Sequence, residues 1–187
     1  MIILVKTAEE LLLKTFVDRE YKLVTRPRPC EYHYESTKCP DGPIEVTLVY
    51  NILQILAFAQ TDEILNISGW FTVTWRDPRI YWHPEHYNNI KQIFLPKRLL
   101  WLPDIGLMNS RQKKSFDFSI DEHSRFLVNH MGNVTWMFGE VSEVTCRLDV
   151  TYFPFDSQIC YLLVTPWQST IDHYVLSYNL DGKVVDN

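Results

Sequence analysis

The segment from residue 64 to residue 76 alternates between two kinds of side chain and constrains the fold more than any other stretch. The odd positions are apolar and the even positions mostly polar: Leu65, Ile67, Gly69, Phe71, Val73 and Trp75 against Ile64, Asn66, Ser68, Trp70, Thr72, Thr74 and Arg76. A period of two predicts a β-strand with one face in the core and the other in water. Trp70 lies on the polar face. A ring there covers a neighbouring loop, or lines a ligand site or a subunit interface.

The rest of the chain predicts a short helix followed by many strands. Thr7 to Glu10 forms a T-x-x-E capping box, and the helical spacing after it predicts one short N-terminal α-helix that ends before Pro27. Strands are expected at 44–56, 116–120, 125–130, 134–141, 158–165 and 173–179, with a hairpin turn at 130–133. The sequence therefore predicts a mainly β fold, in which residues 1–187 form one antiparallel immunoglobulin-like β-sandwich with Greek-key character.

The charge of the chain argues against a nucleic-acid partner. The 187 residues carry a net charge of −5, and no run of Lys or Arg forms a basic stripe. No stretch approaches the roughly 20 consecutive apolar residues that a membrane-spanning helix needs. We therefore expect no bound nucleic acid and no transmembrane segment within these residues.

The cysteines and glycosylation sequons point to an oxidising compartment. They are Cys30, Cys39, Cys146, Cys160, Asn66 and Asn133. Four cysteines allow three pairings, and the two short-range pairs, Cys30–Cys39 and Cys146–Cys160, are the simplest choice. A disulfide that closes a loop of about 15 residues contributes roughly 3 kcal/mol in the chain-entropy model. Disulfides and N-glycans both occur in secreted proteins, so each sequon is an expected modification site.

No residue pattern of a known kind of active site is present. The motifs G-x-S-x-G and H-E-x-x-H and a phosphate-binding glycine loop are all absent. The nearest approach to a metal site is His83-Pro84-Glu85-His86, which we interpret as a surface turn because of its proline. Asp117, Asp121 and Glu122 do not have the spacing of an EF-hand loop. We therefore expect no enzymatic activity, no cofactor and no metal ion.

Four motifs follow one another along the chain. Trp70 and Trp75 form W-x4-W, and Trp101 begins Trp-Leu-Pro-Asp. Thirteen residues, including D-x-x-x-F-P-F-D, separate Cys146 from Cys160, and a tryptophan stands seven residues after the second cysteine. From the N-terminal helix to about residue 177, the chain resembles the extracellular domain of the Cys-loop pentameric ligand-gated ion channels. The W-x-P-D-I motif is similar to the corresponding motif of nicotinic and serotonin-type subunits and of the soluble acetylcholine-binding proteins.

The resemblance implies an aromatic ligand site between neighbouring subunits of a pentamer. By position, Trp167 corresponds to the tryptophan of the principal face, and Trp70 to its counterpart on the complementary face. Further site residues are implied at Met108, Leu127, Thr135 and Met137. Met108 stands where nicotinic-like members have a tyrosine. Ring faces attract an ammonium group by about 0.5–2 kcal/mol each. The implied partners are thus a small-molecule agonist, with a cationic amine as the candidate, and identical or homologous subunits.

The tip of the segment between Cys146 and Cys160 is apolar, because Phe153, Pro154 and Phe155 precede Asp156. The resemblance implies that this loop couples agonist binding to a membrane domain outside these 187 residues, at the extracellular face of the plasma membrane. Soluble acetylcholine-binding proteins have a polar loop there, so the apolar tip favours a channel subunit. Two alternatives stay open: a secreted binding pentamer that gates nothing, and a sandwich domain for adhesion or scaffolding. The hairpin that caps the pocket in the family is expected to follow the last residue.

Overall fold

The fold is seen in a computed structural model, which describes residues 7, 10, 25–28, 42–112, 118, 125–180 and 183–185. Nearly all regular structure in these residues is β. The strands are β1 (Ile44–Ala59), β2 (Ile64–Arg76), β3 (Gln92–Pro96), β4 (Ile105–Leu107), β5 (Arg125–Asn129), β6 (Asn133–Thr145), β7 (Val164–Pro166), β8 (Tyr174–Leu180) and β9 (Lys183–Val185). Two short 3-10 helices, η1 (Pro84–Tyr87) and η2 (Lys97–Leu99), flank β3.

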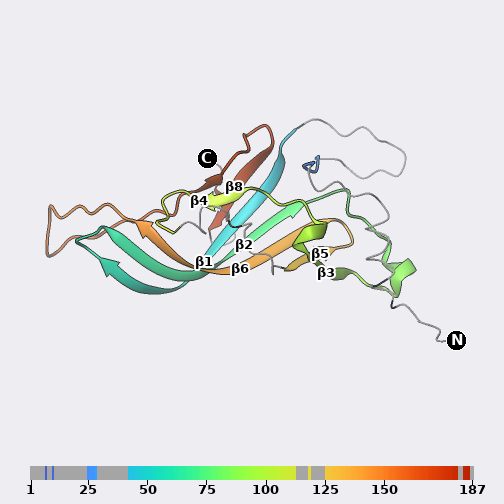
Figure 1. The fold of residues 1–187 in the computed structure, drawn as a ribbon, viewed down its shortest axis with the longest axis horizontal. Helices are drawn as coiled ribbons and strands as arrows, with labels where there is room; N and C mark the ends of the chain where they lie inside the picture. The colour runs from blue at the N-terminus through green and yellow to red at the C-terminus, as the bar shows by residue number, and fades with distance from the viewer. Residues whose placement is uncertain are drawn as a thin grey trace.

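The strands form a large and a small sheet (Figure 1). The large sheet has the order β3-β5-β6-β2-β1-β8-β9, and the small sheet pairs β4 with β7. All strand pairs are antiparallel except β1 with β8, which is parallel. The predicted mainly β sandwich is confirmed, with this one parallel pair as a departure from the antiparallel expectation.

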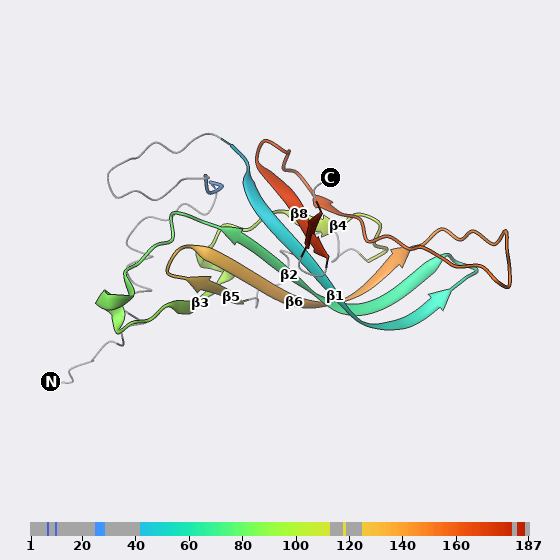
Figure 2. The ribbon, with the colours of Figure 1, turned by 180° about the vertical axis from the view of Figure 1, so that it is seen from behind.

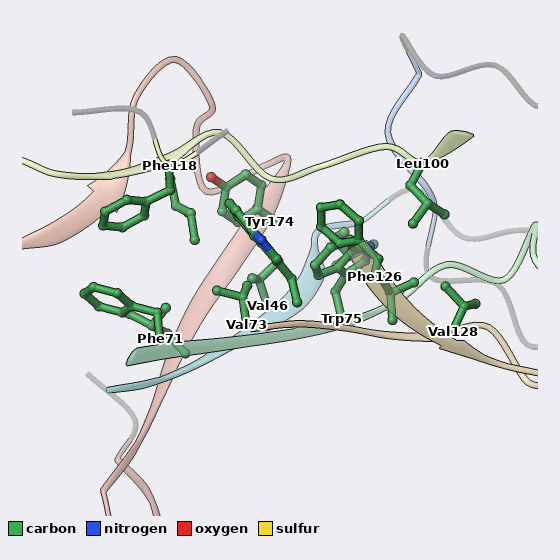
Figure 3. Close-up of a cluster of buried hydrophobic side chains, with 14 of the residues drawn as sticks. Val46, Phe71, Val73, Trp75, Leu100, Phe118, Phe126, Val128 and Tyr174 are labelled. Carbon is green, nitrogen blue, oxygen red and sulfur yellow. The ribbon is translucent and has the colours of Figure 1, made fainter. Parts of the chain in front are cut away.

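The core lies between the two sheets. Phe71, Val73 and Trp75 project to one side of β2, and all three are buried (Figure 3). Ile105 and Leu107 of β4 belong to the same buried cluster. The alternation of residues 64–76 is therefore confirmed. Each such side chain contributes about 1.5–3 kcal/mol on full burial.

Most predicted strands lie where the sequence placed them, although β1 continues to Ala59, three residues beyond the expected end. Two further strands differ more in length. The strand expected at 134–141 continues to Thr145, and the strand expected at 158–165 is shortened to β7. The reason for the second difference is the side chain of Asn109. Its Nδ2 donates to the carbonyl of Tyr161 at 2.8 Å, and its Oδ1 accepts from the backbone N–H of Leu163 at 3.1 Å. One amide side chain thus supplies the partners that a neighbouring strand would otherwise provide.

The hairpin expected at 130–133 is confirmed. Gly132 has a φ of 83°, which favours glycine, and the side chain of Asn129 accepts from the backbone N–H groups of Met131 and Asn133 at 3.0 and 2.9 Å. The stretch His83–His86 also forms the expected turn, since η1 begins directly after His83.

Several predictions fall at least partly outside the described residues. The capping box itself is formed: the backbone N–H of Thr7 donates to Glu10 at 2.9 Å, and that of Glu10 donates to Thr7 Oγ1 at 3.2 Å. The helix that follows it, the Cys30–Cys39 pair and the strand at 116–120 apart from Phe118 lie outside the described residues. Phe118 is buried in the core. No helix in the described part of the chain is long and apolar enough to cross a membrane.

The far half of β1 departs from the simple alternation. Its first half buries Ile44, Val46 and Leu48, but Ile52 and Ile55 are exposed. The pairing with β2 shifts register between Ile52 and Gln54 and again between Ile55 and Ala57. Such bulges bend a strand and interrupt its two-residue period. The far half of β1 presents apolar side chains to solvent, although Ile52 and Ile55 pair with Gly69 and Ile67 on the core face of β2.

Candidate functional site

Four of the predicted site residues share one face of the large sheet, which we call the outer face. Trp70 pairs with Gly139, Thr72 with Met137, and Thr74 with Thr135 across β2 and β6. Directly opposed residues of paired strands point to the same side. Leu127 of β5 is in turn opposite Thr135. The outer face thus gathers the predicted complementary-face residues Trp70, Leu127, Thr135 and Met137.

The surroundings of Trp70 are open and mixed in polarity. Trp70 is half-buried, and Met137, diagonal to it on the next strand, is 61% exposed. Its direct neighbours are Asn51 of β1 and Gly139 of β6, and Gly139 has no side chain to cover the ring. An indole ring, a flexible thioether and the Thr135 hydroxyl together form a surface that can contact an apolar or cationic group.

The other two predicted site residues belong to the small sheet. Met108 follows β4, and Trp167 follows β7. Their exposed fractions are 44% and 51%. The backbone N–H of Met108 donates to the carbonyl of Leu163 at 2.8 Å, which extends the pairing of the two strands. Two large side chains are therefore exposed at opposite ends of a short, rigid ladder.

A partly buried aspartate fixes the segment that carries Trp167. Asp104 accepts hydrogen bonds from the backbone N–H groups of Gln168 and Ser169 at 2.6 and 2.9 Å, and from the hydroxyl of Tyr174 at 2.9 Å. Its own carbonyl accepts from the N–H of Trp167 at 2.7 Å. Partial burial opposes ionisation, but the hydrogen bonds from Ser169, Gln168 and Tyr174 outweigh it and lower the pKa of Asp104. The ionised carboxylate therefore holds the Trp167 segment in place.

Sequence reasoning missed this role. The W-L-P-D motif marked Asp104 as part of a resemblance, but nothing in the sequence indicates that its partners lie more than 60 residues further on. Tyr174 was also missed, although it is fully buried. Burial, the charge of Asp104 and the hydrogen bond to it all raise the pKa of Tyr174. The hydroxyl therefore stays protonated and remains a donor to Asp104.

The two groups of site residues face in opposite directions. The odd-numbered residues of β2 point into the core that also contains Ile105 and Leu107 of β4, so Trp70 points away from the small sheet. One chain consequently presents Trp70 on one side and Trp167 on the other, and does not bring the two rings together.

The predicted coupling loop is closed by a disulfide between Cys146 and Cys160, whose Cα atoms are 5.0 Å apart. Its tip is exposed: Phe153 is 70% and Phe155 is 92% accessible to solvent, and Pro154 is exposed as well. Asp156 is less exposed and accepts a hydrogen bond from the side chain of Gln158. These apolar rings gain nothing from water, so the tip is suited to contact another surface.

The loop lies beside the turn between β1 and β2. The backbone N–H of Cys146 donates to the carbonyl of Glu63 at 2.8 Å, and the N–H of Leu148 donates to the Glu63 carboxylate at 3.4 Å. Both elements occupy the same end of the molecule, and η1 lies at the other end (Figure 1). The exposed residues Ile52 and Ile55 of β1 lead towards the same turn. This end of the molecule is therefore unusually apolar for an exposed surface.

The two glycosylation sequons differ in their surroundings. Asn133 is exposed at the first position of β6. Asn66 is half-buried in the middle of the large sheet, between Ala57 of β1 and Glu143 of β6, and its Oδ1 is buried. Asn133 is the more accessible of the two.

The chemistry of the site residues suits reversible binding. Within the described segments, no group of three or more His, Cys, Asp or Glu residues could hold a metal ion. The outer face near Trp70 and the small sheet near Trp167 provide aromatic rings, thioethers and hydroxyls. Such groups hold a ligand by dispersion, cation–π attraction and hydrogen bonds.

Comparison with known proteins shows the family to which the chain belongs. Residues 9–186 match the family described as the neurotransmitter-gated ion-channel ligand binding domain. The chain is 37% identical over 131 residues to the acetylcholine receptor subunit alpha-type acr-15 of Caenorhabditis elegans, covering 70% of this chain and 26% of the relative. It is 31% identical over 177 residues to the acetylcholine receptor subunit beta-type acr-3 of the same organism, covering 95% of this chain and 34% of the relative.

A further relative is ligand-gated ion channel 4 of Caenorhabditis elegans, which is 30% identical over 154 residues, covering 82% of this chain and 23% of the relative. The chain therefore spans between about a quarter and a third of the length of these relatives.

Proposed function

The chain belongs to the neurotransmitter-gated ion-channel ligand-binding domain family, and we propose that it binds a small-molecule agonist between neighbouring subunits of a pentamer. In the proposed site, Trp167 and Met108 of one subunit face Trp70, Leu127, Thr135 and Met137 of the next. Ligand-binding domains of this family are extracellular in the receptor, so the proposed site is open to an agonist outside the cell.

One observation carries the proposal. Trp70 and Trp167 lie on opposite sides of the core of one chain, and each keeps a face that the chain itself does not cover. An exposed tryptophan is costly unless a ligand or a partner surface covers it. Head-to-tail contact between copies places the Trp167 side of one copy against the Trp70 side of the next, and such contacts form a closed ring when the rotation between copies returns to the first copy.

A cationic amine is the ligand that this set of side chains fits best. Two indole faces attract an ammonium group, and exclusion of water by the neighbouring subunit strengthens the attraction. Met108 supplies a polarisable thioether where a ring would give a further cation–π contact. We therefore propose an amine agonist for which the two tryptophan rings contribute more of the binding free energy than Met108 does.

The proposal includes a coupling role for the Cys146–Cys160 loop. The exposed rings of Phe153 and Phe155, with Pro154 between them and Asp156 after them, would contact a membrane domain that follows this domain in the receptor. Agonist binding would shift the balance between resting and open arrangements, and the loop would transmit that shift.

Mixed assemblies of two variants test the shared site. Trp70→Ala and Trp167→Ala are each expected to weaken agonist binding at least about tenfold, which corresponds to about 1.4 kcal/mol. When the two variants are expressed together, some interfaces combine an intact Trp167 with an intact Trp70. These assemblies should recover binding at a fraction of their sites. Tyr152→Ala, which removes an exposed ring from the coupling loop, is the matched control and should bind normally.

The mixing experiment separates a shared site from a site within one chain. If both tryptophans belonged to a pocket inside one subunit, no mixture would restore binding. Unchanged binding in both single variants would also contradict the proposal, provided that circular dichroism shows both to be folded.

A further inference from the structure

A groove of about 600 Å³ opens on the outer face, towards the Arg76 end of β2 and away from Trp70. We call it the threonine groove. Its polar lining residues are Glu45, Thr47, Thr74, Arg76, Asn133 and Thr135. They come from β1, β2 and β6, which are neighbours in the large sheet (Figure 2).

The strand register arranges these side chains in rows. Thr74 is opposite Thr47 on one side and Thr135 on the other, so three threonines cross the floor of the groove in line. Arg76 is opposite Asn133 in the next row. Cross-strand neighbours lie about 4.5–5.5 Å apart, so the rows form one continuous hydroxyl- and amide-bearing surface.

Much of the hydrogen-bonding capacity of this surface is unused. Thr47 shares a hydrogen bond with Ser177 at 3.1 Å, and Ser177 donates to the Glu45 carboxylate at 3.1 Å. By contrast, the side chains of Thr74, Arg76 and Thr135 make no hydrogen bond to the described part of the chain. A ligand rich in hydroxyl and amide groups is the natural complement to such a surface.

Asn133 lies in the groove and also begins the sequon Asn133-Val134-Thr135. Its side chain is exposed, and its backbone N–H is already bonded to Asn129 at 2.9 Å. The carboxamide is therefore positioned by a rigid turn and makes no hydrogen bond of its own within the described residues. A group bonded covalently to Nδ2 of Asn133 would therefore lie next to the threonine groove.

We propose that Asn133 carries an N-linked glycan and that the first N-acetylglucosamine lies in the threonine groove. In the secretory pathway, Nδ2 of Asn133 loses a proton and bonds to C1 of the sugar, while the bond from C1 to a lipid-linked diphosphate breaks and the lipid diphosphate leaves. The sugar hydroxyls and acetamide face the Thr74 and Thr135 hydroxyls and the Arg76 guanidinium. Asn66, half-buried in the middle of the sheet, carries no glycan.

The groove also links modification to binding, and this consequence rests on the proposed function. Thr135 is both the third residue of the sequon and a member of the proposed complementary face. A glycan at Asn133 therefore lies at the edge of the proposed subunit interface that is farther from the Cys146–Cys160 loop. Asn133→Gln removes the glycan and keeps Thr135, whereas Thr135→Ser keeps the sequon and removes only a methyl group.

The test begins with site occupancy. The full-length protein is expressed in animal cells, and glycopeptides that contain Asn133 and Asn66 are analysed by mass spectrometry. We expect a glycan at Asn133 and none at Asn66. An unmodified Asn133 in the folded, exported protein would overturn the proposed glycan at Asn133. A glycan at Asn66 would overturn the statement that Asn66 carries none. No agonist is needed, so this result is independent of the proposed function.

The placement of the first sugar is tested on folded protein. An endoglycosidase that leaves one N-acetylglucosamine is compared with an amidase that removes the whole glycan and converts Asn133 to aspartate. The unglycosylated variant Asn133→Asp, measured against Asn133→Gln, gives the effect of the new charge alone. Protein with one remaining sugar should keep the melting temperature of the intact glycoprotein, and complete removal should lower it by about 2–4 °C. The groove variant Thr74→Val keeps the sequon and should reduce this difference. Equal melting temperatures after the two treatments would show that the groove does not hold the sugar.

Discussion

Replacing Asp104 by asparagine should release the segment that carries Trp167 without unfolding the domain. The carboxylate accepts hydrogen bonds from Gln168, Ser169 and Tyr174. A carboxamide has only one acceptor oxygen. With its oxygen in the Oδ2 position, the asparagine still accepts from Gln168 and Ser169, and its NH2 group donates to the Tyr174 hydroxyl. The substitution therefore removes the negative charge that strengthens the two backbone hydrogen bonds.

The expected magnitude follows from the kind of bond. Hydrogen bonds to a charged group contribute about 1.5–3 kcal/mol each, against about 0.5–1.5 kcal/mol between neutral groups, and the carboxylate is only partly buried. Loss of the charge under two backbone hydrogen bonds therefore costs about 1.5 kcal/mol, which corresponds to roughly a tenfold shift in the local equilibrium. Agonist binding should weaken by a similar factor, because Trp167 spends less time in its binding position.

Amide hydrogen exchange measures this effect directly. In Asp104→Asn, the amides of Gln168 and Ser169 should exchange about tenfold faster than in the wild type, while those of β2 should not change. Asp149→Asn is the matched control, since Asp149 also accepts a backbone N–H, from Thr151, but lies on the coupling loop. Unchanged exchange at Gln168 and Ser169 in the Asp104 variant would refute the assignment of Asp104 as the residue that holds this segment.

The same carboxylate gives the segment a defined pH dependence. Because the pKa of Asp104 is lowered in the folded protein, the unfolded state binds the proton more tightly. The stabilisation is therefore complete above the unfolded pKa of about 3.9 and is lost as the pH falls below it. The protection of the Gln168 and Ser169 amides, which is their exchange rate relative to that of an unfolded peptide at the same pH, is therefore expected to fall on acidification through that range. In Asp104→Asn, the protection of these two amides should not show this fall.

The remaining predictions concern the coupling loop and the hairpin. Phe155→Ser should leave agonist binding unchanged and impair gating in the complete receptor, as recorded by electrophysiology; normal currents would contradict the coupling role. Replacing Cys146 and Cys160 by serine should lower the free energy of unfolding in urea by about 3 kcal/mol. Gly132→Ala should destabilise the fold by at least 1–3 kcal/mol, because the residue has a φ of 83° and its Cβ would collide with the carbonyl of Asp77; an unchanged urea midpoint would refute this.

Sequence patterns predicted the faces of strands better than the contacts between distant segments. The two-residue period of β2 placed Trp70 on the outer face, and the same period on β6 placed Thr135 and Met137 beside it. The length of β7 could not be predicted, since it depends on the side chain of Asn109, more than 50 residues away. Local periodicity fixes the direction of a side chain, but long-range hydrogen bonds depend on tertiary packing.

The exposed far half of β1 illustrates the same limit. Ile52 pairs with Gly69 and Ile55 pairs with the buried Ile67, so both lie on the core face of the sheet, yet both are exposed. Whether a core-face residue is buried depends on what the rest of the chain places over it, and the period of the strand does not encode this. Binary patterning therefore predicted a strand there, but not the surface it forms.

The strands that carry the proposed complementary face also lead to the apolar end of the molecule. The β2 strand begins one residue after Glu63, and β6 ends one residue before Cys146, where the N–H of Cys146 bonds to the carbonyl of Glu63. Thirteen consecutive residue pairs join the two strands without a register shift. A continuous ladder of this length is stiff, because bending it would strain many hydrogen bonds at once. A displacement at Trp70 would thus reach the coupling loop as a movement of the whole β2–β6 pair. We infer that the ladder, more than the loop alone, would connect ligand binding to a membrane domain.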